Sequence, residues 1–208
     1  RHGETIYNRL KKIQGSVNVN LSNIGIKQAH DFAIDSNDIY DIAYHSSLSR
    51  SKETLDIICD KLNNSPKKEL NDLIIERSYG IFEGFTDQDI ISKYPNLYNE
   101  WLNNENVGID NAETIDKVVI RIKKFISNLI QSKYENILVV THSGVLYALY
   151  KFIAQLDLGQ RPDIHFKNCS LNILTIVYDK ETINLKFNIH NQTEINRSCP
   201  TKEIISNT

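Results

Sequence analysis

Two kinds of apolar segment alternate along the chain, and this alternation restricts the fold more than any other feature of the sequence. Residues 137–140 (ILVV) form a continuous apolar run, as expected for a strand that is buried on both faces. A second apolar segment at 145–153 follows it closely and is predicted to be helical. Residues 41–45 form another strand-like run, and the segment 48–62 after it has apolar residues at helical spacing. Strands that alternate with helices predict an α/β sheet covered by helices.

The remaining segments extend this pattern. The other predicted elements are a long helix at 114–132, a short helix at 86–93 that stops at Pro95, an extended segment at 68–75 and a pair of strands at 172–178 and 183–189. The sequence therefore predicts a three-layer α/β/α sandwich with a mostly parallel central sheet. We expect one domain at 1–190 with a small helical cap at about 87–110, and a loose polar tail at 191–208.

Size, charge and cysteine content restrict the class of protein. With 208 residues and 24.0 kDa, the chain suits one well-buried domain. A net charge of -2 and a pI near 6.3 give no reason to expect nucleic acid or an acidic membrane surface as a partner. Cys59, Cys169 and Cys199 are scattered and lack the paired spacing of a zinc site. They favour a cytoplasmic protein with free thiols.

Four polar segments, far apart in the chain, carry residue types that suit phosphate chemistry. They are Arg1–Thr5 (RHGET), Ser47–Arg50 (SLSR), Glu76–Gly80 (ERSYG) running into Phe82–Thr86 (FEGFT), and Thr141–Gly144 (THSG). In an α/β sheet, ligands bind beyond the carboxyl ends of the strands, which is where His142 and Arg50 are expected. Helix N-termini and arginine side chains there suit an anion. A neutral histidine can attack phosphorus, and a carboxyl group can protonate the departing oxygen.

In this order the segments resemble the histidine phosphatase superfamily, also called phosphoglycerate-mutase-like. The RHGET opening resembles its signature, Ser46–Arg50 its second motif and Val140–Gly144 its second histidine. Further matching positions are Asn8, Gln14–Gly15, Leu21–Ser22, Gly25, Gln28–Ala29, Asn168–Ser170 and Asn188–His190. The resemblance thus extends from Arg1 to about His190.

The resemblance implies a role for each matching residue. His2 would be the nucleophile that becomes phosphorylated, Glu76 the general acid, and Arg1, Arg50 and His142 the groups that hold the phosphoryl group. His2 must be neutral to attack, and a charged His142 would stabilise the transition state. The implied substrate-binding residues are Asn8, Gln14, Gly15, Ser143, Gly144, Arg77 and Tyr79. No metal and no cofactor are expected, because arginine and histidine supply the positive charge.

Some residues have a second interpretation. Glu83 is a local rival of Glu76 for the role of the acid, and Tyr79 could equally pack in the core. The cap aromatic residues Tyr94, Tyr98 and Trp101 could line a substrate pocket or pack against one another.

The branch of the family is also open to more than one interpretation. Glu76–Gly80 resembles the mutase form, whereas Phe82–Thr86 and Glu4 of RHGET resemble the phosphatase form. No arginine occurs between Arg77 and Arg121 to bind an acidic substrate, which favours a phosphomonoesterase. A phosphoglycerate mutase and a non-catalytic phosphate-binding or interaction protein on the same fold remain the alternatives.

The beginning of the chain carries one further expectation. In this family a hydrophobic strand directly precedes the RHG segment and lies in the middle of the sheet. The printed sequence begins at Arg1 without such a strand. We therefore expect it to be part of a longer protein, and we expect an interruption at the centre of the sheet.

Overall fold

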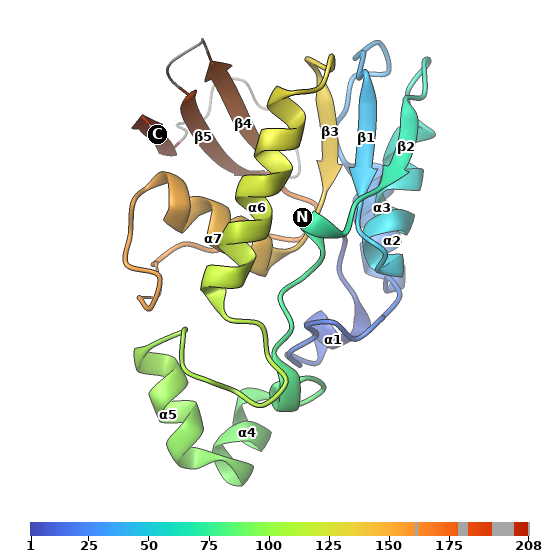
Figure 1. The fold of residues 1–208 in the computed structure, drawn as a ribbon. Helices are drawn as coiled ribbons and strands as arrows, with labels where there is room; N and C mark the ends of the chain where they lie inside the picture. The colour runs from blue at the N-terminus through green and yellow to red at the C-terminus, as the bar shows by residue number, and fades with distance from the viewer. Residues whose placement is uncertain (161, 179–182, 193–201, 208) are drawn as a thin grey trace.

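In the residues that the structure describes, the chain folds around two sheets of three strands each, which lie side by side (Figure 1). The computed structural model describes residues 1–160, 162–178, 183–192 and 202–207. The parallel sheet has the order β2-β1-β3, and its strands are β1 (Ile42–His45), β2 (Lys67–Leu70) and β3 (Ile137–Val140). The antiparallel sheet has the order β4-β5-β6, and its strands are β4 (Leu171–Tyr178), β5 (Ile183–Gln192) and β6 (Lys202–Asn207).

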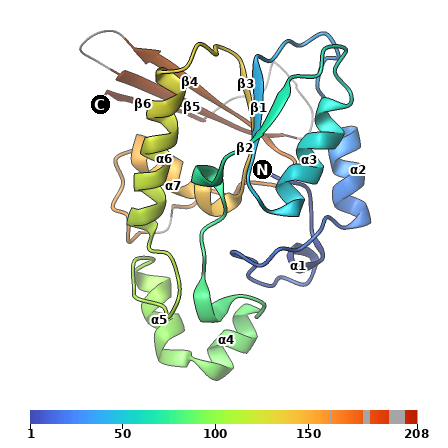
Figure 2. The same cartoon turned by 45° about the vertical axis from the view of Figure 1, so that its right-hand side comes forward.

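Helices cover both faces of the parallel sheet, which confirms the predicted α/β class. The helices of the main body are α1 (Ile6–Arg9), α2 (Asn23–Asp31), α3 (Ser49–Cys59), α6 (Ile115–Ile130) and α7 (Ser143–Ile153). Successive side chains of β1 point to opposite faces. Ala43 packs against Leu55 of α3, and Ile42 packs in a cluster with Phe125 of α6. Figure 2 shows α6 and the pair α2–α3 on opposite sides of the strands.

The expected interruption at the centre of the sheet is present in the described part of the chain. β3 pairs with β1 along one edge, and β4 pairs with β5 along one edge, but β3 and β4 do not pair with each other. A cavity of about 920 Å³ lies between them. Its walls include Leu138 of β3, Leu174 of β4 and Leu149 of α7, so the cavity is largely apolar.

Two segments differ from the prediction. The extended segment predicted at 68–75 stops at Leu70, and Asp72–Ile74 form a 3-10 turn, η1. Asn71 caps this turn, because its Oδ1 accepts a hydrogen bond from the backbone N–H of Leu73 at 3.0 Å.

The tail predicted to be loose contains β6, whose backbone pairs antiparallel with β5 from Lys202 to Asn207. Pairing with a neighbouring strand thus overrides the polar composition of the tail.

The cap lies below the main body in Figure 1 and consists of two short helices, α4 (Asp87–Lys93) and α5 (Pro95–Asn103). Pro95 begins α5, because the first turn of a helix needs no N–H from that position. Tyr98 and Trp101 are buried against Phe82, with 5.5 Å between the ring centroids of Phe82 and Trp101. Tyr94 packs on the same cluster. Of the two interpretations of these aromatic residues, packing of the cap core is therefore the one the structure supports.

We expect Phe82→Ala to destabilise the cap by about 3–5 kcal/mol, because it removes a fully buried ring from this cluster. Trp101 is the single tryptophan of the chain, so its fluorescence during urea unfolding reports on the cap. Ile91→Ala, at an exposed position of α4, serves as the control and should change stability by less than about 0.5 kcal/mol. Equal unfolding midpoints for Phe82→Ala and the wild type would contradict the prediction.

Two further features bear on the sequence-based expectations. None of the helices in the described ranges combines the length and the apolarity needed to cross a membrane. Cys59 and Cys169 are buried free thiols, as expected, whereas Cys199 lies outside the described residues.

Candidate active site

The carboxyl ends of β1 and β3 lie at the same edge of the parallel sheet and place the second and fourth polar segments side by side. His45 at the end of β1 is in register with Val140 at the end of β3. Beyond these strand ends, α3 begins at Ser49, and α7 begins at Ser143 directly after His142. Two helix N-termini therefore face this edge, as in many anion sites, although the first N–H of α3, that of Ser49, already donates to Oδ1 of Asn18 at 2.8 Å.

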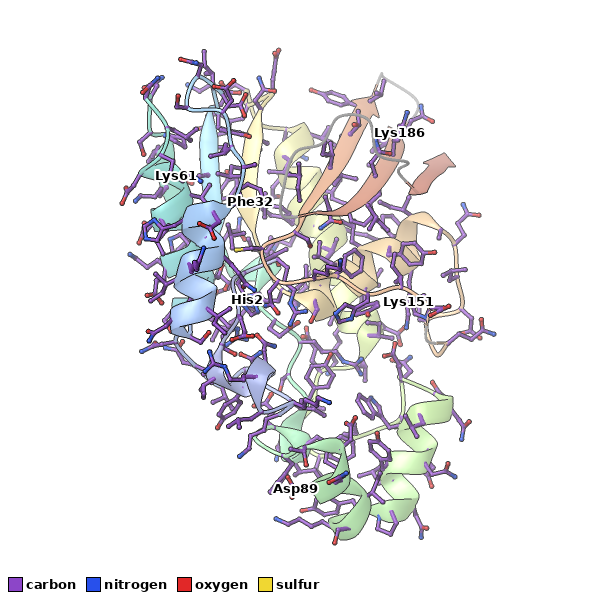
Figure 3. The ribbon with its side chains drawn as sticks, turned by 180° about the vertical axis from the view of Figure 1, so that it is seen from behind. His2, Phe32, Lys61, Asp89, Lys151 and Lys186 are labelled. Atoms are coloured by element: carbon purple, nitrogen blue, oxygen red, sulfur yellow. The ribbon has the colours of Figure 1, made fainter. Side chains whose placement is uncertain are left out.

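The first segment crosses this edge, and three parts of the chain hold its backbone. The N–H of His2 donates to the carbonyl oxygen of Thr141 at 3.0 Å. On the other side, the N–H of Cys169 donates to the carbonyl of His2 at 3.2 Å, and Nδ2 of Asn168 donates to the same carbonyl at 3.0 Å. Gly3 lies too close to the backbone of α2 to carry a side chain, since an added Cβ would be 2.6 Å from the carbonyl oxygen of Gly25. His2 is thus held in one position in the interior of the main body, well above the cap helix that carries Asp89 (Figure 3).

The two histidines face each other, with ring centroids 5.1 Å apart. Both are buried, His2 at 1% exposure and His142 at 0%. Nδ1 of His2 is 2.7 Å from the carbonyl oxygen of Gly3. A carbonyl oxygen only accepts hydrogen bonds, so Nδ1 carries the hydrogen, and Nε2 keeps its lone pair in the neutral ring. His2 is therefore oriented as a nucleophile that attacks through Nε2.

The second ring is oriented by a serine hydroxyl. Oγ of Ser46 is 2.8 Å from Nε2 of His142 and also accepts a weaker hydrogen bond from the N–H of Leu48 at 3.3 Å. The hydroxyl hydrogen of Ser46 can then be donated to Nε2, which places the hydrogen of the neutral ring of His142 on Nδ1. Nδ1 is buried and has no protein partner.

The environment lowers the pKa of both histidines well below the ordinary value of 6.5. For His2 the main cause is burial, followed by the positive charges of Arg1 and Arg50. For His142 it is again burial, followed by His2 and Arg50. We predicted a neutral His2 beside a charged His142, but the structure favours the neutral form of both. A charge on His142 therefore requires the negative charge of a bound phosphoryl group.

Two arginines surround the histidines, the fully buried Arg50 and the half-buried Arg1. Nη1 and Nη2 of Arg50 donate to the carbonyl oxygens of Val17 and Gly15 at 2.7 and 2.8 Å, and Nη1 of Arg1 donates to that of Phe166 at 2.7 Å. Burial lowers the pKa of Arg50 to about 10, so the group is still charged at neutral pH. The Nε atoms of both arginines are buried without a protein partner.

Glu76 completes the arrangement. Its Oε1 accepts a hydrogen bond from the N–H of Arg77 at 2.9 Å and lies against Gly144, where an added Cβ would be 2.4 Å away. The carboxyl group can lie at the start of α7 only because residue 144 is glycine. Burial raises the pKa of Glu76, and the nearby charge of Arg50 opposes this effect. The protonated form needed for an acid thus persists to higher pH than in an exposed glutamate.

Three other predicted site residues, Asn8, Gln14 and Gly15, make contacts within the protein near the His2 segment. Oε1 of Gln14 accepts a hydrogen bond from Thr5 at 2.8 Å, and Oδ1 of Asn8 accepts one from Asn168 at 3.3 Å. Gly15 adopts a φ of +51° and provides a carbonyl for Arg50. These contacts place Asn8, Gln14 and Gly15 beside the His2 segment, and substrate contact by them remains a prediction.

Arg77 and Tyr79 lie between the main body and the cap. Nε and Nη2 of Arg77 donate to the carbonyl oxygens of Glu113 and Glu105 at 2.8 and 2.6 Å, and its guanidinium lies 5.2 Å from the centre of the Tyr79 ring. The hydroxyl oxygen of Tyr79 would be 3.3 Å from a Cβ added at Gly144, so its ring reaches the start of α7. Arg77 thus stabilises the loop that leads out of the cap, and its contact with substrate remains a prediction.

Two residues that contact the histidines had no role assigned from the sequence. Ser46 belongs to the second motif, and Asn168 to the C-terminal one, but neither motif reveals which histidine its side chain reaches. The position of Ser46 directly after the strand β1 was the available signal. In the residues that the structure describes, no three His, Cys, Asp or Glu side chains are grouped so that they could hold a metal ion.

Comparisons with known proteins identify the family and the fold. The model of the histidine phosphatase superfamily, branch 1, matches residues 1–189. Phosphoserine phosphatase 1 of Hydrogenobacter thermophilus is 28% identical, over 91% of this chain and 90% of that protein. A 2,3-bisphosphoglycerate-dependent phosphoglycerate mutase of Buchnera aphidicola is 30% identical, over 86% of this chain and 90% of that protein. The solved structure of a mycobacterial glucosyl-3-phosphoglycerate phosphatase with VO3 has a similar fold, with a TM-score of 0.79, 21% identity and coverage of 90% and 94%.

Proposed function

The chain belongs to the histidine phosphatase superfamily, and from this premise we propose that it is a metal-independent phosphomonoesterase that forms a phosphohistidine on His2. The family and the phosphatases among its relatives make it a hydrolase of phosphate esters. The proposal concerns the chemical route, the residues that carry it and the class of substrate.

One observation carries the proposal. Three buried nitrogen atoms around the histidine pair have no hydrogen-bond partner, namely Nε of Arg1, Nε of Arg50 and Nδ1 of His142. A buried donor without a partner costs about 1–3 kcal/mol, so three of them in one site indicate a ligand that accepts hydrogen bonds. Two of the donors are cationic, which favours an anion. A phosphoryl group fits this combination of charge and donors.

The first half-reaction transfers the phosphoryl group to the protein. Nε2 of His2 forms a bond to phosphorus while the bond between phosphorus and the ester oxygen breaks. The electron pair of that bond stays on the oxygen, which takes the proton of Glu76. Arg1, Arg50 and His142 stabilise the charge that develops on the phosphoryl oxygens.

The second half-reaction returns the protein to its starting state. The carboxylate of Glu76 removes a proton from a water molecule, whose oxygen attacks phosphorus. The P–N bond breaks, and its electron pair returns to Nε2 of His2. Inorganic phosphate leaves, and Glu76 is protonated again. The guanidinium groups of Arg1 and Arg50 supply the positive charge in both steps, which is the basis for proposing that no metal takes part.

A mutase is the second candidate, because relatives of this kind exist and because Glu76–Gly80 resembles the mutase form. The environment of Arg77 argues against it. Two of its nitrogens already donate to the carbonyls of Glu105 and Glu113. Between Arg77 and Arg121 the sequence offers no other arginine to bind a substrate carboxylate. We therefore propose a phosphatase that acts on a small phosphorylated metabolite, with phosphoserine as the first ester to test, as the name of one relative suggests.

We expect the protein to release phosphate from p-nitrophenyl phosphate and from phosphoserine at an unchanged rate in EDTA. A rate that EDTA abolishes and magnesium restores would overturn metal independence. A parallel incubation with 3-phosphoglycerate and a primer bisphosphate tests the branch, and efficient formation of 2-phosphoglycerate would identify a mutase. Absence of turnover with all esters, despite binding of inorganic phosphate, would favour the non-catalytic alternative.

A further inference from the structure

The carboxylate of Glu83 joins two segments that carry different parts of the proposed chemistry. Its Oε1 accepts hydrogen bonds from the N–H of Ser16 at 2.9 Å and from the N–H of Tyr79 at 2.9 Å. The hydroxyls of Ser16 and Ser78 also lie within 3.1 Å of it, and Ser16 Oγ is 2.9 Å from Oε2. One side chain thus binds donors from residues 16 and 78–79, which are far apart in the sequence.

On one side, Glu83 contacts the loop that holds Arg50. Gly15 in this loop has a φ of +51°, and an added Cβ would be 2.0 Å from Oε1 of Glu83. The loop therefore packs directly on the carboxylate. The carbonyls of Gly15 and Val17 in the same loop accept the two hydrogen bonds from the guanidinium of Arg50. The position of Arg50 consequently depends on where Glu83 fixes this loop.

On the other side, Glu83 fixes the segment that carries Glu76. The N–H of Tyr79, three residues after Glu76, donates to Glu83, and so does the hydroxyl of Ser78. Glu83 itself is rigidly placed, because it directly follows Phe82, whose ring is fully buried in the cap core. Its oxygens are occupied by protein donors, which separates it from Glu76 as the candidate acid.

We propose that Glu83 is a positioning residue that sets the place of the acid Glu76 relative to the phosphate-binding Arg50. The inference rests on the proposed function, in which Glu76 protonates the leaving oxygen while Arg50 holds the phosphoryl group. Neither role requires Glu83 to touch the substrate. A mutation far from the reacting atoms that displaces a catalytic group by about 1 Å can lower the rate by about 10²-fold.

The test uses two esters that differ in their need for an acid. The nitrophenolate of p-nitrophenyl phosphate leaves readily without a proton, whereas the alkoxide of glycerol phosphate requires one. For Glu83→Gln we expect kcat/KM to fall about 10²-fold with glycerol phosphate and about tenfold with p-nitrophenyl phosphate. We also expect a higher inhibition constant for inorganic phosphate, because Arg50 is held less well. Glu100→Gln, an exposed glutamate of α5, is the control and should behave as the wild type.

Ser16→Ala provides a second variant that leaves the buried side chains intact. Ser16 is exposed, and its substitution removes only the hydroxyl that binds Glu83. We expect the same selective loss with glycerol phosphate at a smaller size. Equal losses with both esters and an unchanged inhibition constant for phosphate, in either variant, would overturn the positioning role. A wild-type protein inactive towards both esters would instead overturn the proposed function, and the inference with it.

Discussion

Replacement of His2 by asparagine is expected to lower turnover of p-nitrophenyl phosphate by about 10⁴-fold or more, because loss of a nucleophile removes the covalent route entirely. Asparagine retains a short polar side chain in this buried position, so the variant should keep the fold, which thermal unfolding can check. His30→Ala, at an exposed position of α2, is the control and should keep wild-type turnover. The asparagine variant still contains Arg1, Arg50 and His142, and we expect it to bind inorganic phosphate.

The covalent intermediate gives a second measurement of the same prediction. An N–P bond is labile in acid and stable in alkali, so the phosphorylated wild-type protein should survive an alkaline quench. Mass spectrometry should place the phosphate on the peptide that contains His2, and His2→Asn should carry none. Phosphate found only on serine or threonine, or turnover by His2→Asn close to that of the wild type, would contradict the assignment of the nucleophile.

The sequence predicted those parts of the fold and site that depend on local pattern. Buried strands give continuous apolar runs, so β1 and β3 were found, and so was the long helix α6 with its regular spacing. The residues that follow β1 and β3 were correctly expected to meet, because parallel strands bring their carboxyl ends to one edge. That rule is sufficient to place Arg50 near His142. Arg1 and His2 were placed there by the family resemblance alone.

Features that depend on tertiary contacts were not predictable in the same way. The hydrogen bond between Ser46 and His142 joins residues from two strand ends, and no sequence pattern specifies it. The lowered pKa of His142 results from burial beside other positive groups, which the sequence does not reveal. Glu76 and Glu83 also lie close together in the sequence, and both were candidates for the acid. Only the contacts of their oxygens, with Arg77 N–H in one case and with Ser16 and Tyr79 in the other, separate an acid from a positioning group.

Replacement of Glu76 by glutamine is expected to lower kcat/KM for glycerol phosphate by about 10²–10⁴-fold, the usual contribution of a general acid, and to affect p-nitrophenyl phosphate much less. The reason is again the leaving group, since glutamine cannot donate a proton to an alkoxide. Glu100→Gln in the cap is the control for loss of a carboxylate elsewhere. Equal losses with the two esters would argue that Glu76 binds or orients the substrate and does not protonate it.

The pH dependence follows from the directions of two pKa shifts. Burial raises the pKa of Glu76 above 4.5, so this acid stays protonated to higher pH than an ordinary glutamate. The rate with glycerol phosphate should therefore fall as the pH rises through that raised pKa. Burial and the arginines lower the pKa of His2 below 6.5, so the nucleophile stays neutral to lower pH than an ordinary histidine. The loss of rate on the acidic side of the pH profile should therefore lie well below pH 6.5. The phosphate group of the substrate itself titrates at about pH 6, and it does so equally in assays of the wild type and of Glu76→Gln. The ratio of the wild-type rate to the variant rate therefore removes this contribution. That ratio should decrease with rising pH, because the variant has no acid to lose, and a ratio that does not change with pH would assign the alkaline limb to another group.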